Sequence, residues 1–275
     1  MKNFLTRAIS AFWFAGILIF CILFHKLTFI GLFLILMLFC IYEFNRLIKL
    51  KSAFPYIIGL MMFVFGNIFN MEEVPYIELF RYVGVLLFLT IFVTFVSILF
   101  YKKEEVVNHL GKIFLSVIYI AVPFTLIAQI PFLNSNIQYV NTTILGVFLL
   151  IWTNDTFAYI IGSNFGKHKL LKRISPNKTI EGFIGGMMAA FLGSYFLSHY
   201  FDSLTSNQWF VIALIVSTFG VLGDLIESMF KRQAGVKDSG TFIPGHGGFL
   251  DRLDSVIFAA PFIFIYLQFI SYDVS

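Results

Sequence analysis

Acidic, basic and hydroxyl side chains share one helical face in the C-terminal half of the chain. Four of them stand at positions i, i+3, i+4 and i+7, namely Asp224, Glu227, Ser228 and Lys231. Their neighbours are apolar, and an ionised side chain inside a membrane costs about 2.5–3.5 kcal/mol on insertion scales. The simple alternative is that the two acids pair with Lys231 and Arg232 near the helix end. Two acids, a hydroxyl and a cation on one stripe instead favour a functional site.

A glycine-rich turn and two more acids follow this face along the chain. The turn contains three glycines, Gly245, Gly247 and Gly248. Glycine lets the backbone approach a ligand closely, so N–H groups here can meet phosphate oxygens, and His246 lies among them. Asp251 and Asp254 follow at i, i+3 around Arg252, where the last helix should begin. One acid there is an ordinary partner for the helix dipole, but two beside such a turn favour Mg²⁺ with phosphate oxygens completing its shell.

The stretch 152–186 carries a second group of polar residues. Asp155 is a third acid in an apolar segment, and a basic loop follows that ends at Lys178. A basic loop is also what the cytoplasmic side of a membrane protein requires. Thr179 and Glu181 resemble a helix start, with Glu181 as the expected cap. A ridge of small residues for helix packing recurs at every fourth position: Gly182, Gly186, Ala190 and Ser194.

The elements that position these residues must suit a bilayer. Of the 275 residues, 59% are hydrophobic and only 12% are charged, whereas a soluble domain is about 25% charged. The mean hydropathy of +0.89 agrees. The net charge of +4 is small, and the basic residues form short runs between apolar segments, which excludes a nucleic-acid-binding face. We therefore expect an all-α polytopic membrane protein.

Apolar segments long enough to cross a membrane, about 20 residues each, recur along the chain. Nine are expected, at 8–24, 27–44, 53–69, 78–100, 109–130, 141–162, 180–200, 208–230 and 253–271. The first follows Lys2 and Arg7 and has no small-residue cleavage site, so it is predicted to be a retained helix and not a signal peptide. Cys21 and Cys40 lie inside apolar segments and are expected to be packing residues.

The basic residues support this count and predict an orientation. With a cytoplasmic N-terminus, 17 of the 19 lysines and arginines fall on cytoplasmic segments, and only Lys26 and Arg81 fall outside. The positive-inside rule therefore predicts nine spans in the cell membrane, an external C-terminus and the long polar loops at the cytoplasmic face. Residues 1–105 are predicted to form about four plain membrane helices, and 106–275 a catalytic part.

The residues alone predict phosphoryl or nucleotidyl transfer on a lipid. Carboxylates with a metal ion, together with Lys and Arg, can neutralise phosphates and hold them in line for displacement. The chain contains neither a Walker A motif nor a kinase signature. The membrane setting implies that one substrate is a lipid.

The stretch from Ser228 to Asp254 resembles the signature of bacterial phosphatidate cytidylyltransferases, also called CDP-diacylglycerol synthases. That pattern runs through Ser, Lys-Arg, Lys-Asp, His-Gly-Gly and Asp-Arg-x-Asp. It is matched without departure by Ser228, Lys231, Arg232, Lys237, Asp238, His246, Gly247, Gly248, Asp251, Arg252 and Asp254. The stretch 152–186 is similar to the family's upstream segment, while the first hundred residues are similar only in hydropathy.

The resemblance implies that CTP and phosphatidate react to give CDP-diacylglycerol and pyrophosphate. It also implies a Mg²⁺ site with a second cation such as K⁺, and a homodimer. Asp224, Asp251 and Asp254 would hold the metal and would form the catalytic group with Lys231 and Ser228. The other residues would contact substrates: Arg232, Lys237, Asp238, His246, Gly247, Gly248, Arg252, Asp155 and Lys178.

Two other functions stay open from the sequence. A CTP-dependent polyprenol or phytol kinase would use similar groups, but it would release CDP in place of pyrophosphate. An ion-coupled transporter would use Asp155 and Asp224 as proton or cation sites. A basic face and a glycine–histidine turn do not favour a cation path, so the transporter is the weaker alternative.

Overall fold

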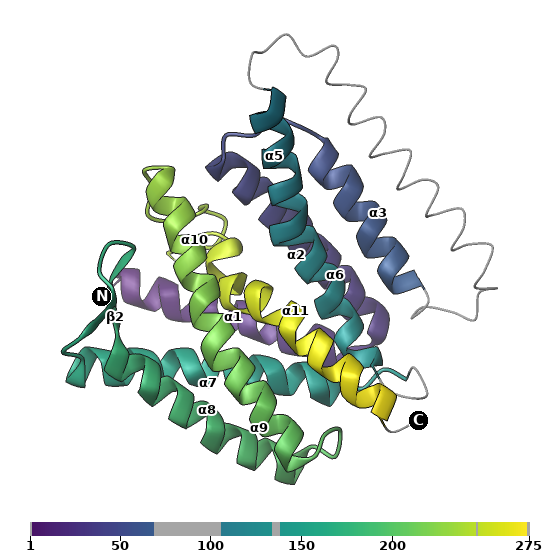
Figure 1. Cartoon of the computed structure of the whole chain (residues 1–275), viewed down its shortest axis with the longest axis vertical. Coiled ribbons are helices and arrows are strands. Elements are labelled where there is room, and N and C mark those ends of the chain that lie inside the picture. The colour runs from purple at the N-terminus through teal and green to yellow at the C-terminus, as the bar shows by residue number, and fades with distance from the viewer. Residues whose placement is uncertain (1, 69–105, 134–137, 246, 274–275) are drawn as a thin grey trace. The chain divides into compact units, whose positions relative to one another are not determined.

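The computed structural model describes residues 2–68, 106–133, 138–245 and 247–273, and these are mostly helical (Figure 1). They form two compact units. The first comprises the described parts of Met1–Gln129 together with Ser239–Leu250, and the second comprises those of Ile130–Asp238 and Asp251–Ser275. The division into residues 1–105 and 106–275 stays a prediction, and the first apolar helices after residue 105 pack on the N-terminal helices.

The first unit is a helical bundle (Figure 1), and its helices contact one another and bury apolar side chains. Phe29, Phe33 and Phe124 are fully buried in it, and Cys40 is buried as the predicted packing residue. Its helices are α1 (Lys2–Phe24), α2 (Lys26–Leu47), α3 (Phe54–Ile68), α5 (Val106–Ser116) and α6 (Val122–Gln129), with a π-helical turn (Val117–Ala121) between the last two.

The second unit is built around a helical hairpin. Its elements are α7 (Asn141–Phe165), β1 (Lys169–Leu171), β2 (Ser175–Thr179), α8 (Ile180–Tyr200), α9 (Ser206–Ile215), a π-helical turn (Val216–Gly220), α10 (Val221–Gln233) and α11 (Leu250–Asp273), of which Leu250 belongs to the first unit. The small-residue ridge of α8 faces α7: a Cβ at Gly182 would lie 2.7 Å from the Ala158 carbonyl oxygen, and one at Gly186 would lie 2.7 Å from that of Asn154. The predicted packing role of this ridge is confirmed.

The connection between α7 and α8 differs from the sequence-based prediction. It contains a two-stranded antiparallel hairpin, in which Lys169 pairs with Thr179 and Leu171 with Ser175. The predicted helix start is confirmed, but its cap is Thr179, whose side chain accepts the Gly182 N–H (3.1 Å). Glu181 was expected to be the cap and is not, because its longer side chain reaches back to the backbone N–H groups of residues 167 and 168.

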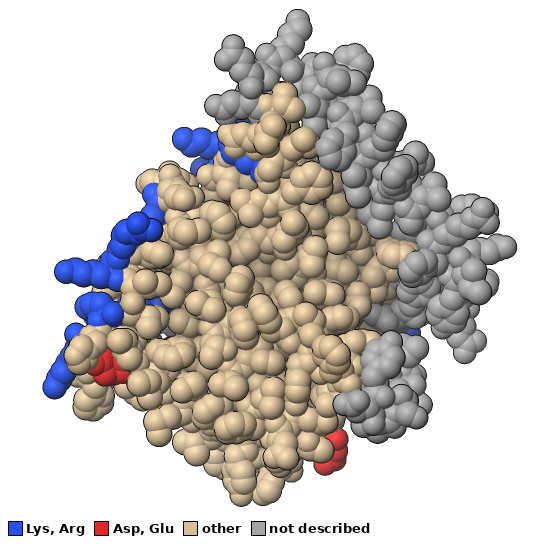
Figure 2. Space-filling view, viewed as in Figure 1, with Lys and Arg blue, Asp and Glu red and all other residues tan. Residues whose placement is uncertain are grey.

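Eight of the nine expected membrane segments coincide with described helices, and the segment 78–100 lies outside the described residues. Within the described ranges, six helices are long and apolar enough to cross a membrane: Lys26–Leu47, Val106–Phe132, Asn141–Phe165, Ile180–Tyr200, Ser206–Gln233 and Leu250–Ile270. The apolar helices Ile9–Phe24 and Phe54–Asn67 are shorter. Most of the visible surface of the described residues is free of acidic and basic side chains (Figure 2). These features agree with a multi-pass, all-α membrane protein, apart from the small β-hairpin.

Candidate active site

Close packing of α10 on α11 brings the acids of both helices together in the second unit. A Cβ at Gly223 would lie 2.5 Å from the Asp254 carbonyl oxygen and 2.6 Å from the Cβ of Phe258. Only glycine permits this approach of the two backbones without a shift of one helix. The polar face of α10 therefore lies against the first turns of α11.

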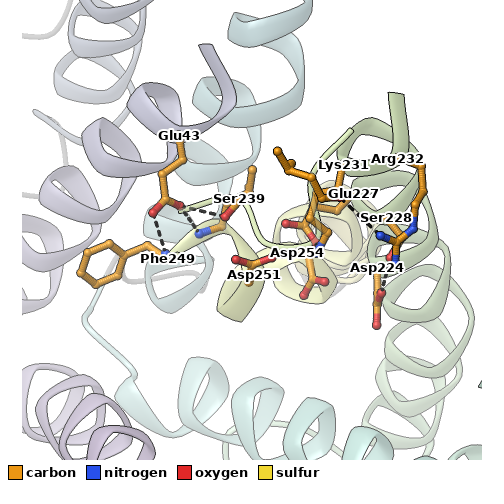
Figure 3. A network of polar contacts seen from close by, with 12 residues as sticks. Glu43, Asp224, Glu227, Ser228, Lys231, Arg232, Ser239, Phe249, Asp251 and Asp254 are labelled. Carbon is orange, nitrogen blue, oxygen red and sulfur yellow. Dashed lines mark hydrogen bonds and ion pairs between the residues drawn. The ribbon is translucent and has the colours of Figure 1, made fainter. Parts of the chain in front are cut away.

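Lys231 joins these two helices by contacting one acid from each (Figure 3). Its Nζ lies 2.5 Å from Oε2 of Glu227 and 2.7 Å from Oδ1 of Asp251. The side chain of Lys231 is 11% exposed, that of Glu227 is 0% exposed and that of Asp251 is 6% exposed. Two carboxylates therefore share one ammonium group in surroundings that water barely reaches, which strengthens each ion pair.

Asp224 makes a second ion pair one turn earlier on α10. The Lys178 ammonium, carried by β2, lies 2.6 Å from Oδ2 of Asp224, and the Ser228 hydroxyl donates to Oδ1 (3.2 Å). The simple sequence-based alternative is therefore right for Glu227 and Lys231 but wrong for Asp224. Arg232 points elsewhere, because its Nη1 donates to the Val236 carbonyl (3.3 Å).

Asp155 and Asp254 complete this cluster from α7 and α11. Asp254 is buried and accepts its neighbour Ser255's N–H (2.7 Å). Asp254 also lies within electrostatic range of Asp224 and Asp155, and Asp155 lies within range of Lys178 and Arg252. Four elements of one unit thus gather the predicted acids and cations around Lys178 and Lys231.

The donor set suits Mg²⁺ in chemistry, although it does not form a complete protein cage. Among the residues that the structure describes, no three His, Cys, Asp or Glu side chains are arranged to hold a metal ion. The predicted group of Asp224, Asp251 and Asp254 instead has lysine partners at its first two members. Mg²⁺ is usually held by one or two carboxylates with substrate phosphates completing its shell, so this arrangement suits it. The buried Oε1 of Glu227 also lacks a hydrogen-bond partner within the described part of the chain.

The glycine-rich turn belongs to the first unit, where a single carboxylate from α2 holds it (Figure 3). Glu43, 1% exposed, accepts the Leu250 N–H (2.8 Å), the Phe249 N–H (3.1 Å) and the Ser239 hydroxyl (3.2 Å). We call Glu43 and these three donors the Glu43 clasp. The N–H groups directly after the turn therefore bind a carboxylate of the protein.

The turn also requires its glycines. Gly245 and Gly247 have positive φ values of 76° and 89°, which favour glycine. A Cβ at Gly248 would lie 2.3 Å from Oε1 of Glu43, so a larger residue would displace the carboxylate. His246 lies outside the described residues. Lys237 and Asp238 are exposed in the loop after α10.

Two acids make important contacts here although the sequence analysis assigned them no catalytic or binding role. Glu227 was placed on the polar face with Asp224, Ser228 and Lys231, but it is not part of the family motif. Glu43 is the one acid in the expected segment 27–44, the same signal that drew attention to Asp155. Reading every acid inside an apolar segment as a candidate would have found it.

Comparison with known proteins places these motifs among related sequences. A family model described as "Cytidylyltransferase family" matches residues 5–270. Proteins named phosphatidate cytidylyltransferase from Staphylococcus aureus (strain COL), Staphylococcus epidermidis (strain ATCC 12228) and Staphylococcus haemolyticus (strain JCSC1435) are each 52% identical over 126 residues. The matched region covers 45% of this chain and 48% of each relative, so the chain spans about half the length of the curated relatives it matches.

Proposed function

The chain belongs to the cytidylyltransferase family, and from that premise we propose that it transfers a cytidylyl group from CTP to phosphatidate. The products would be CDP-diacylglycerol and pyrophosphate, which places the protein in phospholipid biosynthesis. Similar proteins that carry the name phosphatidate cytidylyltransferase support the choice of substrates. The observation that carries the proposal is the buried Lys231, which joins the acidic faces of α10 and α11.

The proposed reaction is a displacement at phosphorus. A phosphate oxygen of phosphatidate attacks the α-phosphorus of CTP and forms a new P–O bond. The bond between the α-phosphorus and its bridging oxygen breaks, and pyrophosphate leaves with that electron pair. Both substrates are anionic, so their approach requires fixed positive charge.

Lys178 and Lys231 supply that charge in preset positions. Each ammonium group is already held by carboxylates before any substrate arrives, so little reorganisation is needed when phosphate oxygens replace one of those contacts. Asp224 and Glu227 act as positioning residues for the two lysines. Arg252, near Asp155, is a further cation for the leaving pyrophosphate.

The proposal includes Mg²⁺ held by the carboxylates Asp224, Asp251 and Asp254, with substrate phosphates completing its shell. When bound, the ion supplies a Lewis acid that stabilises charge developing on the α-phosphate. Removing divalent metal with a chelator should abolish turnover, and added Mg²⁺ should restore it. A second cation such as K⁺ and a homodimer remain part of the proposal, supported by the resemblance of the motif between Ser228 and Asp254.

We further propose nine spans with a cytoplasmic N-terminus, an external C-terminus and the reaction site at the cytoplasmic face. The distribution of 17 of 19 basic residues supports this orientation. A reporter fused after Ser275 should behave as external, and one inserted in the exposed hairpin between Lys172 and Arg173 should behave as cytoplasmic. The reverse pattern would move the site away from the CTP pool and contradict the orientation.

Labelled CTP tests the reaction directly. The purified full chain in detergent receives Mg²⁺, phosphatidate and CTP labelled at either the α- or the γ-phosphate. Cytidylyl transfer places the α-label in the lipid phase and leaves the γ-label in pyrophosphate. Transfer of the γ-label to a polyprenol or diacylglycerol would establish a lipid kinase instead. Ion flux in proteoliposomes without any transfer would indicate a transporter.

A further inference from the structure

The first unit contains a cavity of about 660 Å³. The residues that line it do not belong to the carboxylate cluster of the second unit. Residues from α2, the α2–α3 connection, α3 and α5 line it. Four of them are permanent cations, Arg46, Lys49, Lys51 and Lys112, and His109 is a fifth basic group. The described residues that line the cavity include no acid.

This concentration of charge exceeds what the ends of membrane helices need. Arg46 lies in the last turn of α2, where a cation complements the helix dipole. Lys51 lies in the α2–α3 connection and Lys112 in α5. Cationic side chains from three elements therefore line one cavity. Like charges held together repel one another, and a bound anion removes that repulsion.

The backbone at Lys49 is held in a conformation that favours glycine. The Lys49 N–H donates to the Arg46 carbonyl (3.3 Å) and the Leu50 N–H to the Asn45 carbonyl (2.8 Å), which closes the end of α2. Lys49 has a φ of 53°, and this position in such a motif is usually glycine. The chain thus places a cation here at the expense of backbone strain, and strain of this kind is a pointer to function.

Asn45 supplies an independent indication of a polar ligand. Its side chain lines the cavity and is only 4% exposed. Its amide atoms make no hydrogen bond of normal distance and angle with the described residues, and the group close enough to interact with them is the Tyr56 side chain, which lines the same cavity. An amide has two donors and two acceptor sites, so Asn45 keeps polar capacity for a ligand with oxygen acceptors and a hydroxyl or N–H donor.

We propose that this cavity binds the phosphate-containing headgroup of an acidic membrane lipid. The cavity lies at the end of the span Lys26–Leu47 and near the start of the span Val106–Phe132, which is the level of lipid headgroups. Tyr42 and Tyr56 contribute to its lining, and tyrosine is enriched at this depth. Basic pockets between membrane helices bind acidic headgroups through such contacts. This binding goes beyond the proposed cytidylyl transfer and does not depend on it.

Native mass spectrometry of the full chain in detergent tests the proposal without CTP. The probes are dimyristoyl phosphatidylglycerol, which is not a substrate of the proposed reaction, dimyristoyl phosphatidylcholine with the same chains, and inorganic phosphate. The wild-type protein should prefer phosphatidylglycerol. The double variant Arg46→Ala/Lys49→Ala should bind it about tenfold or more weakly, because two headgroup cations are lost. The matched control Lys172→Ala/Arg173→Ala removes one Lys and one Arg from the exposed hairpin and should bind like the wild type.

Lys49→Gly separates binding from folding. Glycine removes the charge but suits the positive φ, so the thermal unfolding midpoint should be equal to or higher than that of the wild type. Phosphatidylglycerol binding should still weaken by about threefold or more. Equal binding by the Arg46→Ala/Lys49→Ala variant and its control would overturn the proposal. Displacement of the lipid by inorganic phosphate at similar concentration would also overturn it, in favour of a soluble anion.

Discussion

Carboxylate side chains have different roles in the two units because they bind different partners. In the α10–α11 cluster, carboxylates bind the ammonium groups of Lys178 and Lys231. In the Glu43 clasp, a carboxylate binds two backbone N–H groups and a hydroxyl. A side-chain ammonium can exchange a carboxylate for a phosphate, whereas a backbone N–H is fixed by the fold. The first arrangement is therefore suited to handling substrates and the second to holding a turn.

The largest loss of stability is expected for Lys231→Ala. The variant leaves Glu227 and Asp251 buried without their cation, and breaking a buried pair in this way costs roughly 3–5 kcal/mol. Thermal unfolding in detergent should show a clear fall in the midpoint. Cytidylyl transfer should fall by about a hundredfold or more, because a fixed donor to the phosphates is gone.

A double variant sharpens this expectation. Lys231→Ala combined with Glu227→Gln removes one of the stranded charges, so it should recover part of the lost stability but none of the activity. If Lys231→Ala unfolds at the wild-type temperature, the buried ion pair does not stabilise the second unit as described.

An intermediate effect is expected for Glu43→Gln. The amide keeps the size of the side chain but presents an N–H₂ group to one of its present donors, which should cost about 1–3 kcal/mol. Because Asp251 follows Leu250 directly in the chain, a looser turn should also lower turnover, by roughly tenfold. Thermal unfolding and the α-label assay measure the two effects. Wild-type values in both would show that the turn holds its shape without Glu43.

Glu181→Gln is the matched control for that variant. Glu181 also accepts two backbone N–H groups and contacts His168, but its side chain is partly exposed, and water can replace those contacts. We expect neither the unfolding midpoint nor the transfer rate to change. If Glu181→Gln had an effect as large as that of Glu43→Gln, the burial of Glu43 would not explain its importance.

Lys178→Ala should have the smallest effect on stability within the cluster. Both partners of its ion pair with Asp224 are partly exposed, and such pairs contribute about 0–1 kcal/mol. Activity should nevertheless fall by roughly tenfold or more, because Lys178 is proposed to contact phosphate. Comparing Lys178→Ala with Lys231→Ala thus distinguishes a lysine's contribution to protein stability from its contribution to cytidylyl transfer. Full activity in Lys178→Ala would limit the phosphate contacts to Lys231.

Features that depend on a single helix or a single apolar segment were predictable from the sequence. A bilayer requires about 20 apolar residues per helix, and eight expected segments accordingly coincide with described helices. Helical periodicity likewise predicted that Ser228 would meet Asp224 and that Lys231 would meet Glu227. These contacts are local and need no knowledge of packing.

The features that depend on packing between elements were not predictable in this way. Lys178 and Asp224 meet because a β-hairpin, formed in a loop without alternating hydrophobicity, presents the lysine to α10. Glu43 meets Leu250 across 207 positions of the chain, a contact that hydropathy cannot reveal. The phosphate-binding role of the glycine turn stays a prediction, and the contact of the following N–H groups with Glu43 on α2 could not be foreseen from the sequence.

The central claim is that the carboxylates of α10 and α11 carry the chemistry, and matched aspartate variants test it most directly. Asp224→Asn, Asp251→Asn and Asp254→Asn keep the side-chain size and remove one charge each, and Asp202→Asn does the same in the exposed connection after α8. The α-label assay, run over a range of Mg²⁺ concentrations on variants with a normal unfolding profile, gives the answer. We predict that each of the first three loses roughly a hundredfold or more in activity while Asp202→Asn is unchanged. Near-wild-type, Mg²⁺-dependent transfer in two of the three would contradict the account.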